Sequence, residues 1–433
     1  MKPTNALLRF TVENFRSIAQ RKTIKFTPDS IKDEPQNNVI VSDKVRYLST
    51  VAIYGANSSG KSNLVDAIAY MMSIVLGSVK VNDKDVLPYD PFLLNTDSGS
   101  KPTLYEVEAI VNGMRYRYGF SNLEDRICEE WLSQVINSKT EKILFIRNLE
   151  GIGVDPVLFP EGVDLESRTN DNRLFLSLVG QLGGKISNEI ISFFNTSLNV
   201  LSGLDTKGYH LFSRLMLSKK LPGYQQMMAF FQQIQLGFSG LSVKTNDFDP
   251  SDIPLELPSE LRDRLINELT GKKRIEILSS HRIYDKNGKA VGQSSFPFES
   301  MESEGTKKIF DLGGPVFDTI ESGSVLVIDE LDAKMHPLIS QELVKLFNDP
   351  VRNNTGAQLI FTTHDTNLLS SGLLRRDQIW FTEKDSCEQT DVYSMRQIVL
   401  PDGSKPRGDG NLERNYIRGR YGAIPYIRSS FND

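Results

Sequence analysis

Apolar and polar residues alternate with a period of two over much of the first third of the chain, which is the pattern of half-buried β-strands. Four short segments carry this pattern: residues 7–12, 23–26, 105–110 and 114–120. Asn14-Phe15-Arg16-Ser17 separates the first two segments, and Asn112-Gly113 separates the last two. We therefore expect an antiparallel strand pair at the start of the chain and a β-hairpin further on.

The pattern changes at about residue 158. From 158 to 269 apolar residues recur mainly at helical spacing, with Gly and Pro between the runs. Strands and helices then alternate, with strands expected at 274–278, 325–328, 358–362 and 378–382 and helices at 337–347 and 366–374. This rhythm is typical of a parallel α/β sheet. The sequence thus predicts an α/β head made of residues 1–157 and 270–433, interrupted at 158–269 by a helical insertion that serves as a lid or docks a partner.

Composition narrows the class of protein. The 433 residues carry 24% charged and 9% aromatic side chains, which is typical of a globular chain, and a net charge of −5. That balance does not indicate nucleic-acid binding, although a local basic groove is compatible with it. Cys128 and Cys387 are too few for a disulfide framework, and the longest mostly apolar run, 67–79, is shorter than a membrane span. No signal peptide is expected, so we predict a cytoplasmic protein without a membrane anchor.

A short apolar strand at 47–54 runs into a glycine-rich loop that precedes an apolar helical pattern. The loop, Gly55-Ala56-Asn57-Ser58-Ser59-Gly60-Lys61-Ser62, matches G-x-x-x-x-G-K-[ST] completely. The glycines allow successive N–H groups to face phosphates, Lys61 adds a positive charge, and the Ser62 hydroxyl can ligate Mg²⁺. The predicted nucleotide contacts are Gly55, Asn57, Ser58, Ser59, Gly60, Lys61, Ser62 and Asn63.

Two acids follow the buried strand at 325–328. Such a strand delivers Asp329 and Glu330 to its carboxyl end, where Asp329 can hold a metal and Glu330 can orient or deprotonate a water molecule. Because 268 residues (329 − 61) separate Asp329 from Lys61, the two halves of the site flank a large insertion.

His364 follows directly after the strand expected at 358–362, so a parallel sheet would place His364 at the same edge as the two acids. There an imidazole can contact a γ-phosphate or its attacking water. His210, His281 and His336 have no such placement, and we expect them to be structural or surface residues. Ser303-Glu304-Gly305-Thr306 precedes an apolar helix and would favour an anion, although by itself it is a weak signal that often only caps a helix.

Taken in order, these motifs resemble the ATP-binding-cassette heads of SMC and RecF proteins. More narrowly, the chain is similar to the AbiL/RloA-like AAA ATPases of bacterial anti-phage systems, which include the ATPase subunit of PARIS-type defence. Three further segments carry this resemblance: 91–94, 113–120 and 419–425. Its least specific part is 158–269.

The resemblance implies ATP and Mg²⁺ as cofactors and a head-to-head dimer that sandwiches each ATP. Ser303 and Gly305 would contact the γ-phosphate from the other subunit, and Asp332 would reach across the interface. Arg16 would approach the phosphates or form a surface ion pair. The signature lacks the second glycine of LSGGQ, and no glutamine marks a metal-sensing loop, for which 91–95 is the expected place.

Three hypotheses follow for function. The first is a Mg²⁺-dependent ATPase that regulates an effector encoded nearby, a Toprim-type or other nuclease, under a phage-encoded trigger. The second is an ATP-gated scaffold with little turnover, and the third is a RecF-like DNA-repair ATPase. The Arg- and Tyr-containing tail from 407 to 428 fits a nucleic-acid or protein-binding surface, and it fits a solvated or sheet-edge tail as well.

Overall fold

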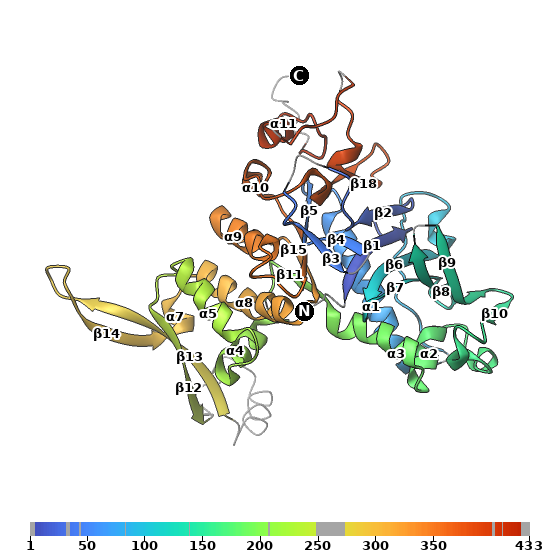
Figure 1. Ribbon diagram of the computed structural model, residues 1–433, viewed down its shortest axis with the longest axis horizontal. Coiled ribbons are helices and arrows are strands. Elements are labelled where there is room, and N and C mark those ends of the chain that lie inside the picture. The colour runs from blue at the N-terminus through green and yellow to red at the C-terminus, as the bar shows by residue number, and fades with distance from the viewer. Residues whose placement is uncertain are drawn as a thin grey trace. The chain divides into compact units, whose positions relative to one another are not determined.

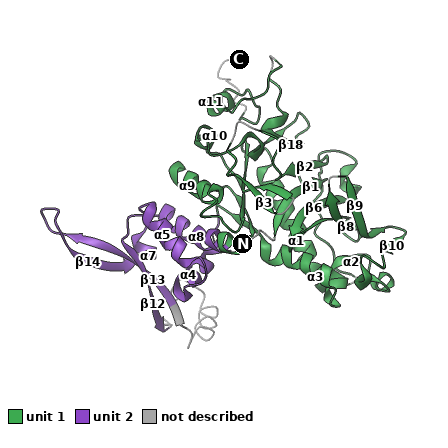
Figure 2. Ribbon diagram, in the orientation of Figure 1, with its two compact units in different colours: residues 1–204, 319–433 green, residues 205–318 purple. Residues whose placement is uncertain are grey.

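The computed structural model describes residues 5–31, 35–42, 45–82, 84–137, 139–206, 208–247, 273–400, 403–408 and 410–425. The chain divides into two compact units (Figure 2). The first unit contains residues 1–204 and 319–433, and the second contains residues 205–318. Each unit has its own sheet and its own hydrophobic side chains, and we describe them in turn.

An antiparallel sheet of seven strands forms one layer of the first unit (Figure 1). Its order is β10 (Gly151–Val154), β9 (Thr140–Asn148), β8 (Ile127–Asn137), β7 (Met114–Asn122), β6 (Thr103–Val111), β1 (Ala6–Glu13) and β2 (Lys22–Lys25). The β1–β2 pair and the β6–β7 hairpin around Asn112-Gly113 are both antiparallel. Both predictions for this region are therefore confirmed.

A second sheet contains the motif-bearing strands. Its order is β11 (Leu198–Ser202), β15 (Val325–Asp329), β16 (Gln358–Thr362), β5 (Thr50–Gly55), β17 (Ile379–Lys384) and β18 (Thr390–Ser394). All neighbours are parallel except β17 and β18. The predicted α/β class, with antiparallel N-terminal strands and a parallel core sheet, is therefore confirmed.

Helix α1 (Lys61–Gly77) contacts strands of both sheets and buries an apolar face between them. By length and composition alone, α1 with the following turn, Lys61–Lys80, is long and apolar enough to cross a membrane. Its buried side chains belong to one hydrophobic core with those of β1, β7 and β15. The other α-helices among the described residues of this unit are α2 (Phe175–Gln181), α3 (Lys185–Ser192), which continues into the π-helical turn Phe193–Ser197, α9 (Pro337–Asn348), α10 (Asn367–Ser370) and α11 (Leu412–Ile417).

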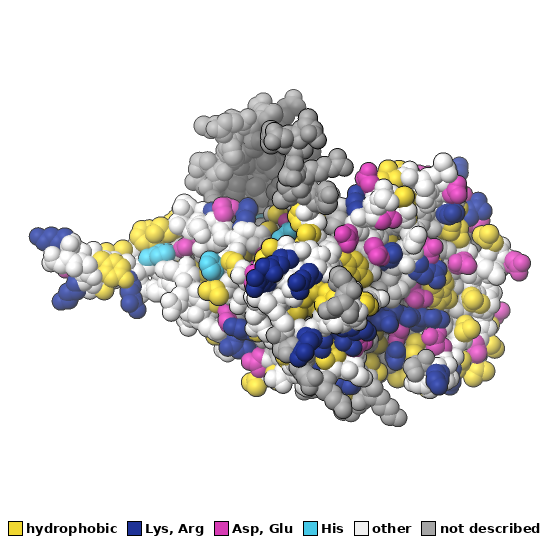
Figure 3. Space-filling model, turned by 90° about the horizontal axis from the view of Figure 1, so that it is seen from above, with side chains coloured by type: hydrophobic (Ala, Val, Ile, Leu, Met, Phe, Trp, Pro, Cys, Tyr) yellow, Lys and Arg dark blue, Asp and Glu magenta, His cyan; other side chains and the backbone are white. Residues whose placement is uncertain are grey.

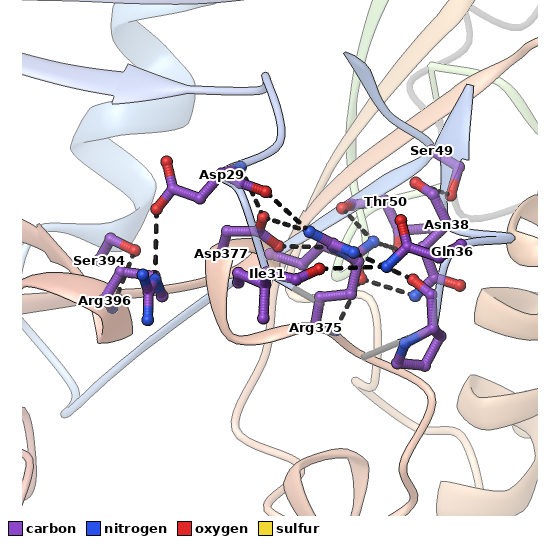
Figure 4. A network of polar contacts seen from close by, with 12 residues as sticks. Asp29, Ile31, Gln36, Asn38, Ser49, Thr50, Arg375, Asp377, Ser394 and Arg396 are labelled. Atoms are coloured by element: carbon purple, nitrogen blue, oxygen red, sulfur yellow. Dashed lines mark hydrogen bonds and ion pairs between the residues drawn. The ribbon is translucent and has the colours of Figure 1, made fainter. Parts of the chain in front are cut away.

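A buried polar network ties the segment before the small hairpin β3 (Val39–Ser42) and β4 (Val45–Leu48) to the start of β17 (Figure 4). Fully buried Arg375 bonds both Asp377 and the Asp29 carbonyl, while Asp29 N–H donates to Asp377. Gln378 joins Asn38 to the Thr50 backbone. The network therefore fixes the start of β5 beside β17, which sets the position of the loop that β5 leads into.

In its described residues, 205–206, 208–247 and 273–318, the second unit packs four α-helices with an antiparallel sheet. The helices are α4 (His210–Lys219), α5 (Tyr224–Gln233), α7 (Phe298–Met301) and α8 (Glu304–Ser322), and the strands, in order, are β12 (Gly240–Asp247), β13 (Lys273–Tyr284) and β14 (Ala290–Pro297). Contacts among Phe230, Phe231, Phe298, Phe310 and Phe317 form its apolar centre. Part of the predicted insertion, 248–269, lies outside the described residues.

The boundaries of the inserted unit differ from those expected. Residues 158–204 pack with the first unit, because β11 pairs in parallel with β15 and because buried Glu130 accepts the N–H groups of Phe175 and Leu176 at the start of α2. The inserted unit is 205–318, and it is not purely helical. Its sheet forms between segments on both sides of 248–272, so local periodicity did not reveal it.

Two predicted elements are shorter than expected. The strand expected at 47–54 is divided at Ser49 between β4 and β5, because its first part pairs with β3 and its second part with the core sheet. The helix expected at 366–374 ends at Ser370, shortly before Gly372 takes a left-handed φ of 69°.

Candidate functional site

The glycine-rich loop connects the end of β5 to the first turn of α1. Gly60, at the N-cap of α1, has φ 104°, and a Cβ there would lie 2.1 Å from Thr390 Oγ1. Ser58 also takes a left-handed φ of 64°. These conformations turn the backbone sharply, as a loop that surrounds phosphate groups must.

A cavity of about 720 Å³ opens at this loop. It is lined by Asn57, Ser58, Ser59, Gly60, Lys61, Ser62, Asn63, Glu330, His364 and Lys384. The register of the parallel strands explains the grouping, because β5, β15 and β16 all end at the same edge of the sheet. The structure therefore brings together most of the predicted nucleotide contacts with Glu330 and His364.

Lys61 is only 5% exposed, and its Nζ donates to the carbonyls of Gly55 (2.8 Å) and Ala56 (3.0 Å). Burial lowers the pKa of Lys61, while the negative charges of Asp329, Glu330 and Asp332 oppose that shift. The two carbonyls occupy two of the three ammonium N–H donors. A phosphate in the cavity would offer the third donor an anionic partner and relieve the cost of burying the cation.

Two neighbouring strands hold Asp329 and Glu330. The Thr362 hydroxyl donates to Asp329 Oδ1 at 2.6 Å and accepts from the Glu330 N–H at 2.7 Å. On the other side the Gly203 N–H donates to the Asp329 carbonyl at 2.6 Å, and a Cβ on Gly203 would lie 2.0 Å from the Glu330 carbonyl oxygen. Glu330 itself has a left-handed φ of 56°. Strand β11 thus supports the acidic turn in a way that only glycine at 203 permits.

The Ser62 hydroxyl and the Asp329 carboxylate are oxygen ligands of the kind that Mg²⁺ prefers. Thr362 donates to one oxygen of Asp329 and orients the carboxylate, as a neighbour of a metal ligand commonly does. The donor set therefore fits a magnesium ion shared with phosphate oxygens.

His364 lines the cavity from the end of β16, and its side chain is exposed to solvent there. Partial burial and the charge of Lys61 lower the pKa of His364, whereas Asp332, Glu330 and Asp329 raise it. The imidazole is therefore mainly neutral near pH 7. Within one chain the Asp332 carboxylate accepts from the backbone N–H of His364. The His364 nitrogen lies 3.3 Å from each carboxylate oxygen of Asp332.

Arg16 does not line the cavity. Its Nε donates to Asp90 at 2.7 Å, a second nitrogen pairs with Asp66, and the guanidinium lies 5.1 Å from the ring centroid of Tyr70. Of the two alternatives for Arg16, the structure has the ion pair. The neighbouring Ser17 is closer to the site, because its hydroxyl accepts from Asn63 Nδ2 at 2.6 Å.

Ser303 and Gly305 lie in the second unit, at the beginning of α8. The exposed Ser303 hydroxyl accepts from the Thr306 N–H at 3.2 Å and caps the helix. The 91–95 segment, where a metal-sensing loop was expected, does not line the cavity. Its Phe92 N–H donates to the side chain of buried Asn14 at 3.1 Å, which anchors the segment to the N-terminal strand pair.

Sequence reasoning missed Lys384 and two threonines. Thr390 Oγ1 donates to the Ser59 carbonyl at 3.0 Å, and Thr382 Oγ1 shares a 2.6 Å hydrogen bond with Ser59 Oγ. Lys384 lies directly opposite Thr390 on the next strand and lines the cavity. The available signal was the predicted strand at 378–382, since a strand beside β5 must bring its end to the loop.

The tail is at least partly a packing element. Tyr416 and Tyr421 are 7% and 3% exposed, and their rings contact Phe381 of β17. Tyr416 also contacts Tyr54, which precedes the loop. These rings are therefore not available as a stacking surface for bases. Arg428 and Tyr426 lie outside the described residues.

A parallel sheet, a glycine-rich loop leading into a helix and acids at the adjacent strand end define a P-loop nucleotide-binding protein. A family model described as "AAA domain, putative AbiEii toxin, Type IV TA system" matches residues 51–370, about three quarters of the chain. The chain belongs to this family. A comparison with curated proteins found no match.

Among solved structures, the chain is similar to an SMC head bound to the C-terminal winged-helix domain of ScpA (14% identity, TM-score 0.43, covering 90% of this chain and 97% of that one). It is also similar to the SMC head domain from Thermotoga maritima (13% identity, TM-score 0.41, covering 91% of this chain and 99% of that one). A third similar structure is the recombination mediator protein RecF with an ATP analogue (14% identity, TM-score 0.34, covering 90% of this chain and 99% of that one).

Proposed function

We propose that the protein is a Mg²⁺-dependent ATPase. The observation that carries this proposal is the single cavity in which the phosphate loop, Glu330 and His364 meet although they are far apart in sequence. Lys61 and the N–H groups of the loop would bind the phosphates, and Ser62 and Asp329 would hold the metal. When bound, Mg²⁺ neutralises charge on the phosphate oxygens and aligns them.

In this proposal Glu330 orients the attacking water and accepts its proton. Its backbone is fixed by Thr362 and Gly203, so the carboxylate enters the cavity from a rigid turn. Neutral His364 can donate a hydrogen bond to the γ-phosphate without repelling Lys61.

We further propose that two chains assemble around ATP in the cytoplasm and regulate a partner effector, a nuclease, in anti-phage defence. The family match and the resemblance to AbiL/RloA-like ATPases support this role. The exposed Ser303 at the start of the 19-residue helix α8 supports the assembly, because the positive end of a helix dipole beside an exposed hydroxyl suits a phosphate from another chain. Gly305 and Asp332 would complete that interface.

The test is steady-state ATP turnover by wild type, Lys61→Ala and Glu330→Gln, with ATP affinity measured in parallel. Lys61→Ala should weaken ATP binding, and Glu330→Gln should keep binding while losing turnover by about 100-fold or more. Unchanged turnover in both variants would refute an ATPase at this cavity. Bound ATP with negligible wild-type turnover would instead favour the ATP-gated scaffold.

A further inference from the structure

The hairpin formed by β13 and β14 extends beyond the sheet of the second unit (Figure 1). Strand β12 pairs with β13 only as far as Ser280, whereas β13 continues to Tyr284 and pairs there with β14 alone. From residue 282 to 295 every side chain is exposed except that of Asp285. This part of the chain, which we call the ribbon (residues 281–295), is therefore a two-stranded β-ribbon whose outer edges pair with no other strand that the structure describes.

The turn of the ribbon is internally locked. The Asp285 carboxylate accepts the N–H groups of Asn287 and Lys289, both at 2.9 Å, and Gly288 takes a left-handed φ of 78°. Asp285 is the only acid of the ribbon, and its charge is used to hold the turn. The side chains of Lys286 and Lys289 are consequently presented on a rigid tip.

The Lys and Arg side chains of the ribbon take part in none of the ion pairs among the described residues. Within the described ranges, no carboxylate lies within 4 Å of Arg282, Lys286 or Lys289. Nearby acids pair elsewhere: Glu299 with Arg214, Glu302 with His281, and Glu304 with Lys307. In Figure 3, Lys and Arg side chains surround the projecting tip at the left. The ribbon is thus a local positive site on a chain whose net charge is negative.

We propose that the ribbon binds double-stranded DNA. The major groove of B-DNA admits a two-stranded β-ribbon, whereas the deep, narrow major groove of A-form RNA excludes one. Lys286, Lys289 and Arg282 would contact phosphates on either side of the groove. Tyr284, 57% exposed and on the same face of β13 as Arg282, would contact sugar or base edges. The proposal does not depend on ATP hydrolysis at the cavity.

The test measures binding of the full chain to a labelled mixed-sequence duplex of about 20 base pairs, between roughly 50 and 200 mM NaCl. The variant R282Q/K286Q/K289Q should bind at least about tenfold more weakly at the lower salt. The slope of log K against log salt should also shrink by about 2 to 3, because each lost phosphate contact removes about 0.9. The matched control K84Q/K101Q/K142Q removes three exposed cations from the first unit and should behave as wild type.

Tyr284→Ala should weaken binding several-fold without changing the salt slope, which separates its contact from the phosphate contacts. The ribbon variant should unfold thermally at the same temperature as wild type, which shows that the variant is folded. Absence of duplex binding by wild type, or equal binding by wild type and the ribbon variant, would overturn the proposal. Tighter binding to single-stranded DNA or to duplex RNA would overturn the assignment to a B-DNA groove.

Discussion

The Thr362 hydroxyl donates a 2.6 Å hydrogen bond to Asp329 Oδ1 from the neighbouring strand. The Thr362 hydroxyl oxygen also accepts the N–H of Glu330, so the side chain of Thr362 fixes both acids at the end of β15. Neither acid depends on a flexible loop for its position. The strand order explains how the site forms although over a hundred residues are inserted between its halves, because β16 pairs with β5 on one side and with β15 on the other.

Thr362 is thus predicted to be a positioning residue. Thr362→Val should lower kcat by about 10- to 100-fold, the range found when a hydrogen-bonding neighbour of a metal ligand is removed, while the Kd for ATP changes little. Thr362→Ser keeps the hydroxyl and should restore most of kcat. Measuring kcat and Kd separately for both variants checks this, and an equal loss in Val and Ser would contradict it.

Lys384 should strengthen nucleotide binding. It lines the cavity, and its Nζ lies 3.5 Å from Glu388 Oε2. This long ion pair is weak, so a phosphate could replace Glu388 as the partner of Lys384. A charge-assisted hydrogen bond contributes about 1.5 to 3 kcal/mol, so Lys384→Met should raise the Kd for ATP by about 10-fold or more. Lys384→Arg should stay close to wild type. Isothermal titration with ATP measures both, and an unchanged Kd in Lys384→Met would contradict the assignment.

Gly60→Ala should abolish ATP binding. The left-handed φ of 104° strains any L-residue, and the added Cβ would meet Thr390 at 2.1 Å. Gly113→Ala is the matched control, because Gly113 also has a positive φ but a Cβ there meets nothing within 4 Å. Thermal unfolding and ATP binding should show a modest loss of stability in Gly113→Ala with intact binding. Normal ATP affinity in Gly60→Ala would show that the loop does not close around phosphate.

His364 should titrate below the ordinary histidine pKa of about 6.5. Burial and the charge of Lys61 disfavour its protonated form, so the proton leaves at a lower pH and the ring stays neutral through pH 7. Since the unfolded chain binds this proton more readily, its titration lowers the stability of the fold as pH falls below about 6.5. Histidine NMR signals assigned with His364→Gln should show the low midpoint. A midpoint at or above 6.5 would contradict the described electrostatics.

Local signals predicted the site better than the domain boundaries. The loop at 55–62 and the strand before Asp329 are short patterns whose chemistry lies within a few residues. By contrast, β11 joins the core sheet by pairing with β15, which lies more than a hundred residues away. The residues at 198–202 carry no local pattern that predicts this pairing. Lys384 was missed for the same reason, because its place at the cavity depends on the pairing of β17 with β5.

Single-turnover hydrolysis, with enzyme in excess over labelled ATP, tests most directly whether Glu330 activates water for ATP hydrolysis in the cavity. We predict that Glu330→Gln binds ATP as tightly as wild type but cleaves it at least about 100-fold more slowly. Glu124→Gln, an equivalent change at an exposed residue of the first unit, should cleave ATP at the wild-type rate. Cleavage by Glu330→Gln at the wild-type rate would contradict the account.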